Sequence, residues 1–369
     1  PLAENNHPET EADKLGFFDT TDVYISEVSA IHAKGTKAND WIELYNGSDS
    51  AVSLDGWFLS DDPDNFTLWR IDGVSIESGA YAVIEATSHV TRQGEGIATF
   101  GISSAGEVIF LVNPNGIVVD VFDTGVQSVG MSSGRVVGDS SISRVFFTTV
   151  TKGSANSSST YSGYSSQPVF SETELYQSST FSLTISSLNA DEIYYTTDGS
   201  KPKTSSKLYS GPITISGNTV IRAIAVCDGL LTSEITTCHY LFVDKHTLPV
   251  VCIAMDPEDF TTIYSVKNYK DVVERQTFIS YYEADGLLGI SFAAGLRAKG
   301  RGTLAYNQKS MTIRIRGCYG RSTVSYAFFD ECEFNEFGSL VLRNGGQDYD
   351  EARIRDALAS RVMQVLNVD

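Results

Sequence analysis

Short runs of alternating apolar and polar residues recur through most of the chain. V-Y-I-S-E-V-S-A at 23–30 and W-I-E-L-Y-N at 41–46 alternate in this way, and turn residues separate such runs. A two-residue period is typical of antiparallel strands that bury one face. Because the runs are short and frequent, they predict a mainly β protein built from sandwich-like parts.

The strand-like runs fall into three blocks. A chain of 369 residues is longer than a single hydrophobic core usually supports, so several domains are expected. A Ser-rich, nearly uncharged stretch at 157–167 predicts a flexible linker after the first block. In the third block, D-P-E-D-F-T-T-I-Y predicts a helix that begins at Asp256 and Pro257. We therefore expect two β-sandwiches, at 20–156 and 168–245, and an α+β domain at 246–369.

Acidic residues are concentrated in the first block. The formal net charge is -19, and residues 1–156 hold 22 of the 46 acidic residues but 8 of the 27 basic ones. Since binding to phosphate backbones needs clustered Lys and Arg, this surface argues against a nucleic-acid partner. No apolar run approaches the roughly 20 residues of a membrane-spanning helix. The prediction is a monomer with no nucleic-acid partner and no membrane span in this segment.

The two ends of the chain predict that it is a segment of a longer protein. A polar, acidic leader occupies residues 1–19 and starts at Pro1 without an apolar signal-type run, and the chain stops at Asp369 within a helical pattern. We expect an extracellular or cell-surface protein whose signal and any anchor lie outside the segment.

The five cysteines are too scattered for a disulfide scaffold or a zinc site. A turn at Asp228 and Gly229 predicts a hairpin that sets Cys227 opposite Cys238. Either a cross-strand disulfide or two reduced thiols fits this hairpin, and buried free thiols are the commoner case.

The first block contains W-I-E-L-Y-N-G-S-D-S-A-V-S-L-D-G-W-F-L-S-D and closes on T-K-G-S-A-N. In order and spacing, residues 20–156 resemble the lamin-tail domain of bacterial secreted and surface proteins. The resemblance implies an immunoglobulin-like sandwich that serves as a binding or spacer module.

Trp41, Glu43, Trp57 and the acids of D-D-P-D at 61–64 allow two interpretations. They either form a carbohydrate or calcium site, or the tryptophans belong to the core and the acids to a solvated turn. The run lacks the D-x-D-x-D-G spacing of an EF-hand loop, which favours core and turn.

In the second block, I-Y-Y-T-T-D-G-S-K-P resembles the β-sandwich domain at the C-terminus of chitobiase-type hexosaminidases. The resemblance covers 168–245 and implies a second, smaller sandwich without catalytic residues, in which Gly199 and Pro202 fix a turn. The predicted fold is thus mainly β and multidomain, with two immunoglobulin-like β-sandwiches ahead of the α+β part.

The third block contains an unusually basic stretch. No acid occurs between Asp285 and Asp330, whereas seven basic residues do: Arg297, Lys299, Arg301, Lys309, Arg314, Arg316 and Arg321. Alternate residues share a strand face, so Arg297 can point with Lys299, and Arg314 with Arg316. Such pairs suit a phosphate-bearing ligand. A solvated strand face offset by the acids at 330–336 fits the same pattern, and both interpretations stay open.

The same block contains G-L-R-A-K-G, N-Q-K-S-M-T-I-R-I and L-V-L-R-N-G-G-Q-D-Y-D-E-A-R-I-R-D-A-L. These motifs resemble the N-terminal part of the spore-coat protein H (CotH) kinase family, which has an atypical protein-kinase-like fold. The resemblance implies phosphoryl transfer from ATP, with ATP and Mg²⁺ as cofactors of the full-length protein. It marks five candidates for binding nucleotide or phosphate: Arg297, Lys309, Asn344, Asp348 and Arg355.

This sequence departs from the family pattern in the loop before Lys309 and in the last motif. Thr303-Leu304 stands where Ser-Arg is usual, Asn307 replaces Pro, and Gln347 replaces Asn. The family's acidic metal ligands and catalytic Asp would follow Asp369, so no catalytic residue or metal ligand is assigned. We expect residues 1–369 alone to lack phosphotransferase activity, because that reaction needs metal-held phosphates.

The last motif predicts a turn that leads into a helix from about Glu351. Asp348, Asp350 and Glu351 either chelate a metal or cap this helix, and capping is the simpler account.

Two functions remain from these patterns. One is a modular exported protein with an ATP-dependent, kinase-like domain behind two sandwich modules. The other is a non-enzymatic surface adhesion or structural protein with a degenerate kinase-like domain. The sandwiches would act as spacers or would bind an unidentified protein or surface polysaccharide.

Overall fold

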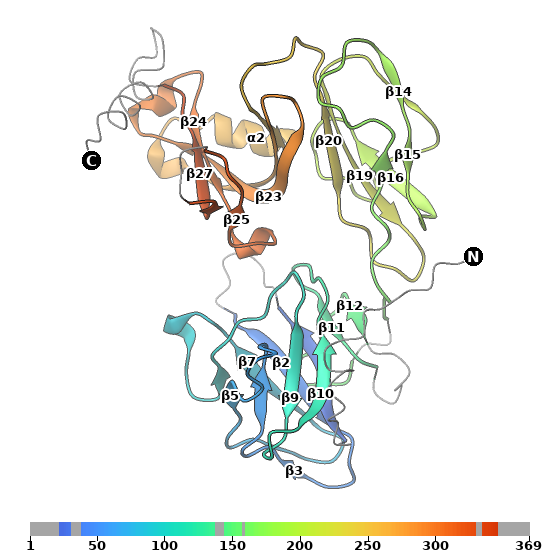
Figure 1. Ribbon diagram of the computed structural model, residues 1–369, viewed down its shortest axis with the longest axis vertical. Coiled ribbons are helices and arrows are strands. Elements are labelled where there is room, and N and C mark those ends of the chain that lie inside the picture. Colours follow the sequence, from blue (N-terminus) through green and yellow to red (C-terminus); the bar gives the residue numbers. More distant parts are fainter. Residues whose placement is uncertain (1–21, 31–37, 137–143, 157–158, 330–333, 346–369) are drawn as a thin grey trace. The chain divides into compact units, whose positions relative to one another are not determined.

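The computed structural model describes residues 22–30, 38–136, 144–156, 159–329 and 334–345. These residues form two compact units, and the boundary between them follows Gly163 (Figure 1). The first unit is a β-sandwich. The second contains a smaller sandwich and an α+β part.

The first unit packs a six-stranded sheet against a four-stranded one. The larger sheet has the order β12-β11-β1-β2-β7-β8 and is antiparallel except for the β7–β8 pair. Its strands are β1 (Val23–Ser29), β2 (Asp40–Asn46), β7 (Tyr81–Ala86), β8 (Ile97–Ala98), β11 (Ser132–Gly134) and β12 (Val145–Phe147). The smaller sheet, in the order β10-β9-β4-β5, has β4 (Phe58–Ser60), β5 (Trp69–Arg70), β9 (Val108–Val112) and β10 (Val118–Asp123). A separate pair joins β3 (Val52–Ser53) to β6 (Ser75–Ile76), and η1 (Val90–Arg92) is a 3₁₀ turn.

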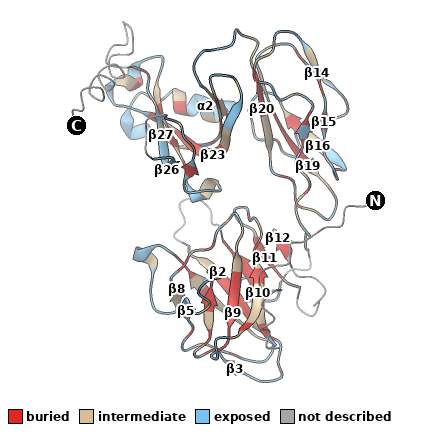
Figure 2. Ribbon diagram, in the orientation of Figure 1, coloured by how far each residue is buried: buried red, intermediate tan, exposed pale blue. Residues whose placement is uncertain are grey.

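Alternation along the strands builds the core of this sandwich (Figure 2). Ile42 and Leu44 of β2 are fully buried and pack in one cluster with Leu59 and Leu111 of the smaller sheet. The predicted sandwich is therefore present, and its strands bury the apolar positions of the alternating runs.

Two buried carboxylates bind the closing T-K-G-S-A-N segment to the outer face of the larger sheet. Thr151 Oγ1 donates to Glu27 Oε2 at 2.8 Å, and the backbone N–H of Gly153 donates to Glu43 Oε2 at 2.6 Å. Asn156 Nδ2 donates to two backbone carbonyls, at 2.9 and 2.7 Å. Thr151, Gly153 and Asn156 therefore each bind the closing segment to the rest of the sandwich.

The tryptophans and the D-D-P-D run follow the core-and-turn interpretation. Trp57 lies in the core, and Trp41 is 3% exposed with Lys152 Nζ 5.7 Å from its ring centroid. Asp62 Oδ1 accepts from the backbone N–H of Asp64 at 2.9 Å, as in an Asx turn. Across the described residues, no group of three or more His, Cys, Asp or Glu is placed to hold a metal ion.

The smaller sandwich of the second unit consists of one four-stranded sheet, in the order β17-β16-β19-β20, and two strand pairs, β13–β15 and β14–β18. Its strands are β13 (Val169–Phe170), β14 (Phe181–Leu183), β15 (Ile185–Ser186), β16 (Glu192–Thr196), β17 (Lys207–Leu208), β18 (Ile213–Ile215), β19 (Thr219–Val226) and β20 (Thr236–Tyr240). Strands from the four-stranded sheet and from both pairs contribute to one hydrophobic core around Tyr240, which is 0% exposed.

Part of the predicted flexible linker at 157–167 is bound to its neighbours. Tyr161 exchanges two backbone hydrogen bonds with Phe146 of the first unit, at 2.8 and 3.1 Å. In the second unit, the N–H of Ser165 donates to the carbonyl of Leu231 at 2.8 Å, and Ser165 is buried. These segments therefore have defined positions rather than the freedom of a Ser-rich linker.

The predicted placement of Cys227 opposite Cys238 is wrong. β19 and β20 form the hairpin, but its register places Ile221 opposite Cys238. Cys227 lies just beyond β19 and is half-buried, whereas Cys238 belongs to the core. The four cysteines in the described part of the chain are all free. The backbone turns at Asp228 and Gly229, where the N–H of Leu230 donates to the carbonyl of Cys227 at 3.2 Å. Cys227 therefore lies at the turn itself, and Cys238 pairs further back along β19.

The α+β part is a five-stranded antiparallel sheet with a helix on one face. The strand order is β21-β22-β23-β24-β27. Its elements are β21 (Val250–Ala254), α2 (Pro257–Tyr264), β22 (Arg275–Tyr282), β23 (Leu288–Lys299), β24 (Ser310–Arg314) and β27 (Ser339–Leu342). A small pair joins β25 (Val324–Ser325) to β26 (Glu336–Phe337), and three 3₁₀ turns are η2 (Tyr269–Asp271), η3 (Gly302–Ala305) and η4 (Gly317–Tyr319).

The predicted helix begins where D-P places it. Asp256 is the N-cap and accepts from the N–H of Glu258 at 2.9 Å, and Pro257 is the first helical residue. Ile263 of α2 is fully buried in the cluster that contains Leu296 and Ile313 of the sheet. No helix in the described residues is both long enough and apolar enough to cross a membrane.

Within the second unit, the sandwich packs against the β22 side of this sheet. The guanidinium carbon of Arg222 lies 6.0 Å from the ring centroid of Phe278, and the ring centroids of His239 and Tyr282 are 6.2 Å apart. Burial lowers the pKa of Arg222 to about 10, and burial together with Arg222 lowers the pKa of His239 to about 4. By register, Phe278 and Arg297 lie on the same face of the sheet, so the sandwich covers one side of the face that carries the cations.

Three carboxyl groups of the first unit favour the neutral form. Burial raises the pKa of Asp40 to about 6, and it raises the pKa of Glu43 and of Glu107 to about 7. Nearby Glu27 adds to the shift at Glu43. Folding therefore binds protons at these groups, and the resulting stability is complete below the unfolded pKa values.

We expect the unfolding free energy of the first unit to fall by on the order of 1–3 kcal/mol between about pH 5 and pH 8. The stability from the raised pKa values is lost as pH rises through about 6 to 7. Trp41, Trp57 and Trp69 are the three tryptophans of the chain, so tryptophan fluorescence during urea unfolding reports this unit. Glu43→Gln should flatten the pH dependence, whereas the exposed Glu95→Gln should not. Stability that rises over this range would contradict the assignment.

Candidate functional site

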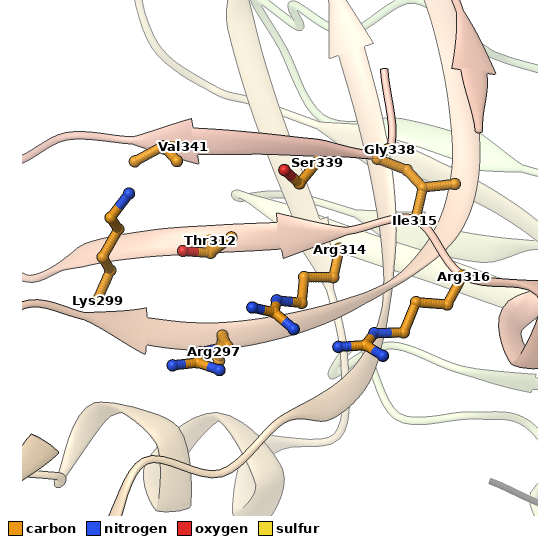
Figure 3. A pocket seen from close by; sticks show the side chains of 9 residues that line it. All are labelled: Arg297, Lys299, Thr312, Arg314, Ile315, Arg316, Gly338, Ser339 and Val341. Atoms are coloured by element: carbon orange, nitrogen blue, oxygen red, sulfur yellow. The ribbon is translucent and has the colours of Figure 1, made fainter. Parts of the chain in front are cut away.

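A pocket of about 510 Å³ lies on the face of the five-stranded sheet opposite α2 (Figure 3). β23, β24 and β27 form its floor. Four cations line it, with the hydroxyl-bearing side chains of Thr312 and Ser339 and with Ile315, Gly338 and Val341. We call the four cations the basic face: Arg297, Lys299, Arg314 and Arg316.

Strand alternation places these cations together. Leu296, Ala298 and Ile313 are at most 1% exposed and belong to the core beneath α2. Their neighbours Arg297 and Arg314 must then point to the opposite face, because successive side chains of a strand alternate. Both predicted pairs of cations therefore share one surface, as the sequence indicated, and the two pairs also meet each other.

Glu274 holds two arginines of the basic face, Arg314 and Arg316, in place. Its Oε2 lies 4.0 Å from Nε of Arg314, and its Oε1 lies 3.4 Å from Nε of Arg316. The Tyr319 hydroxyl donates to Oε1 at 3.0 Å, and the Glu274 side chain is 10% exposed. The side chains of Arg314 and Arg316 remain 37% and 42% exposed, so a ligand can reach both guanidinium groups.

A glycine makes room for this carboxylate. A Cβ atom on Gly295 would lie 2.6 Å from Glu274 Oε1 and 2.7 Å from a ring carbon of Tyr319. Both distances are too short for a side chain, so Glu274 and Tyr319 occupy the space above Gly295. No sequence motif marked Glu274, Gly295 or Tyr319 as a site residue, although a glycine within a strand is a known sign of such a close approach.

The structure separates Lys309 from the basic face. Lys309 Nζ donates to the carbonyl oxygen of Leu304 and, at 3.4 Å, to that of Tyr306. It also lies 5.8 Å from the ring centroid of Tyr264 in α2. Lys309 therefore lies on the core side of β24, where its hydrogen bonds stabilise the loop that contains η3.

Asn344 joins two strands and is 5% exposed. Its Nδ2 donates to the carbonyl of Gln308 at 2.7 Å, and its Oδ1 accepts from Ser310 Oγ at 2.8 Å. These bonds fix the start of β24 beside the end of β27. Of the five predicted binding residues, Arg297 alone lies in the pocket among those described, and Asp348 and Arg355 lie outside the described residues.

Two known families match parts of the chain. Residues 18–125 match the family described as Lamin Tail Domain, and residues 183–240 match the family described as Fn3 associated. No curated protein matches the chain. The matches agree with the two sandwiches and support a modular β-sandwich protein. Neither matched range includes the basic face.

Gly295→Ala should destabilise the second unit by about 1–3 kcal/mol, because the new methyl group overlaps Glu274 and Tyr319. Calorimetry of the whole chain measures this destabilisation. The transition of the second unit is the one that tryptophan fluorescence does not follow, because all three tryptophans lie in the first unit. Gly302→Ala is the matched control, as no atom lies within 4 Å of its Cβ position. An equal effect of the two substitutions would contradict the packing described for Glu274.

Proposed function

We propose that the chain belongs to a modular, exported surface protein whose third part binds a phosphate-bearing or other anionic ligand on its basic face. The convergence of four cations from β23 and β24 on one pocket carries this proposal. Within the described residues, the ion pairs of this face involve one carboxylate, that of Glu274, so the four cations outnumber it. Arg forks match the geometry of phosphate and carboxylate oxygens.

We further propose that residues 246–369 are the N-terminal part of a kinase-like domain of the spore-coat protein H type. The motifs around Arg297 and Asn344 and the basic face support this assignment. In such a domain Arg297, Arg314 and Arg316 would hold phosphate oxygens of ATP, because phosphoryl transfer depends mainly on positioning and electrostatics.

The described residues do not by themselves fit Mg²⁺. This ion prefers oxygen ligands, chiefly carboxylates and water. The basic face offers cationic N–H groups and two hydroxyls, and the described residues gather no acidic metal cluster. The proposal is therefore limited to the anionic part of the nucleotide.

A second candidate function is non-enzymatic adhesion by a degenerate kinase-like domain. The position of Lys309 favours it, because that ammonium group is bound to the carbonyls of its own loop. In this account the basic face still binds an anion, and the two sandwiches bind a protein or a polysaccharide or act as spacers. Under both proposals the protein is extracellular or at the cell surface, and monomeric.

ATP and inorganic triphosphate should each raise the melting temperature of the second unit, because a ligand that binds the folded state alone stabilises it. Arg297→Ala should weaken both affinities by about three- to tenfold. Lys309→Ala should leave them within about twofold, since its side chain lies on the other face. Titration calorimetry on the whole chain measures the affinities, and binding that depends on Lys309 instead of Arg297 would overturn the proposed site.

Phosphoryl transfer separates the two candidate functions. In the longest natural form of the protein, magnesium-dependent transfer from ATP to a protein acceptor is the result expected for the kinase. Anion binding without transfer is the result expected for the adhesion protein.

A further inference from the structure

The cations of the basic face occupy successive positions along the β23–β24 ladder. In order, the register pairs Lys299 with Ser310, Arg297 with Thr312, and Gly295 with Arg314. Arg316 continues the series, because its backbone remains extended, with φ -144° and ψ 146°. Each of these three pairs on the exposed face therefore holds one cation opposite a small residue.

This arrangement is a row rather than a cluster. Side chains on one face of a strand recur every two residues, so neighbouring levels are about 6–7 Å apart and the row is about 20 Å long. Figure 3 shows the same order across the pocket, from Lys299 through Arg297 and Arg314 to Arg316. A single phosphate group would engage one or two levels and leave the others unused.

We infer that the row binds an extended peptide segment with Asp or Glu at every second position. This inference rests on the proposed anion binding and names the class of ligand. An extended peptide presents alternate side chains on one face with the same spacing of about 6–7 Å, so consecutive acids meet consecutive cations. Each carboxylate can then accept two parallel N–H bonds from an arginine fork.

The lining of the pocket disfavours a nucleic acid as the polymer that binds here. Single-stranded nucleic acids are held by a basic groove together with aromatic side chains on which bases stack. None of the residues that line this pocket is aromatic. The net charge of -19 also opposes a long polyanion, whereas a short peptide engages the local charge alone.

A pair of peptides tests whether the spacing matters. Residues 7–15 of this chain, H-P-E-T-E-A-D-K-L, have acids at alternate positions and supply the first peptide. The control, H-P-T-A-E-E-D-K-L, has the same composition with its acids adjacent. Fluorescence anisotropy with the whole protein at low salt should give an affinity about three- to tenfold higher for the alternating peptide.

Substitutions test whether the row is the binding surface. Arg297→Ala and Lys299→Ala should each weaken binding of the alternating peptide, and the arginine should matter more because its fork is bidentate. Lys201→Ala is the matched control, as it removes an exposed cation of the smaller sandwich. The melting temperature of the second unit, measured in parallel, separates lost binding from lost folding.

The outcomes distinguish this inference from the function on which it rests. Equal affinities for the two peptides, with triphosphate still bound, would overturn the peptide inference and leave the anion site intact. Failure of peptides, ATP and triphosphate alike to bind would overturn both. Tighter binding of oligo(dT) than of the alternating peptide would also overturn the inference, in favour of a nucleic acid.

Discussion

The alternation of side chains across a β-strand is the constraint on which the α+β part depends. β23 and β24 must bury Leu296 and Ile313 beneath α2, and the same backbone then presents Arg297 and Arg314 on the opposite face. A shift of the register by one residue would move cations into the core, so the free energy of the core also fixes the basic face. The position of the cations is in this sense a result of the packing on the other side of the sheet.

The same constraint acts in the first unit with opposite charges. There the outward positions of β1 and β2 hold Glu27 and Glu43, which are covered by the closing segment and bind its backbone and side chains. Burial without a neighbouring cation raises the pKa of Glu43. Arg314 and Arg316, in contrast, stay partly exposed beside Glu274. The first face is thus closed by its own chain, and the second remains open to a ligand.

Local patterns predicted what depends on neighbours in the sequence, and they failed where distant pairing decides. Alternation predicted the shared face of Arg314 and Arg316, and D-P predicted the start of α2. The register of β19 with β20 depends on where the backbone turns, and the turn beside Cys227 places Ile221 opposite Cys238. Glu274 precedes the basic stretch by more than twenty residues, and only the pairing of β22 with β23 brings it above Gly295.

Hydrogen–deuterium exchange with and without inorganic triphosphate tests the central claim most directly, namely that the basic face is where this protein binds an anion. A ligand held there should slow exchange in residues 295–299 and 312–316, which carry the cations. Exchange in the loop fastened by Lys309, residues 301–306, should stay unchanged. Protection confined to that loop, or absent from both strands at saturating ligand, would contradict the account.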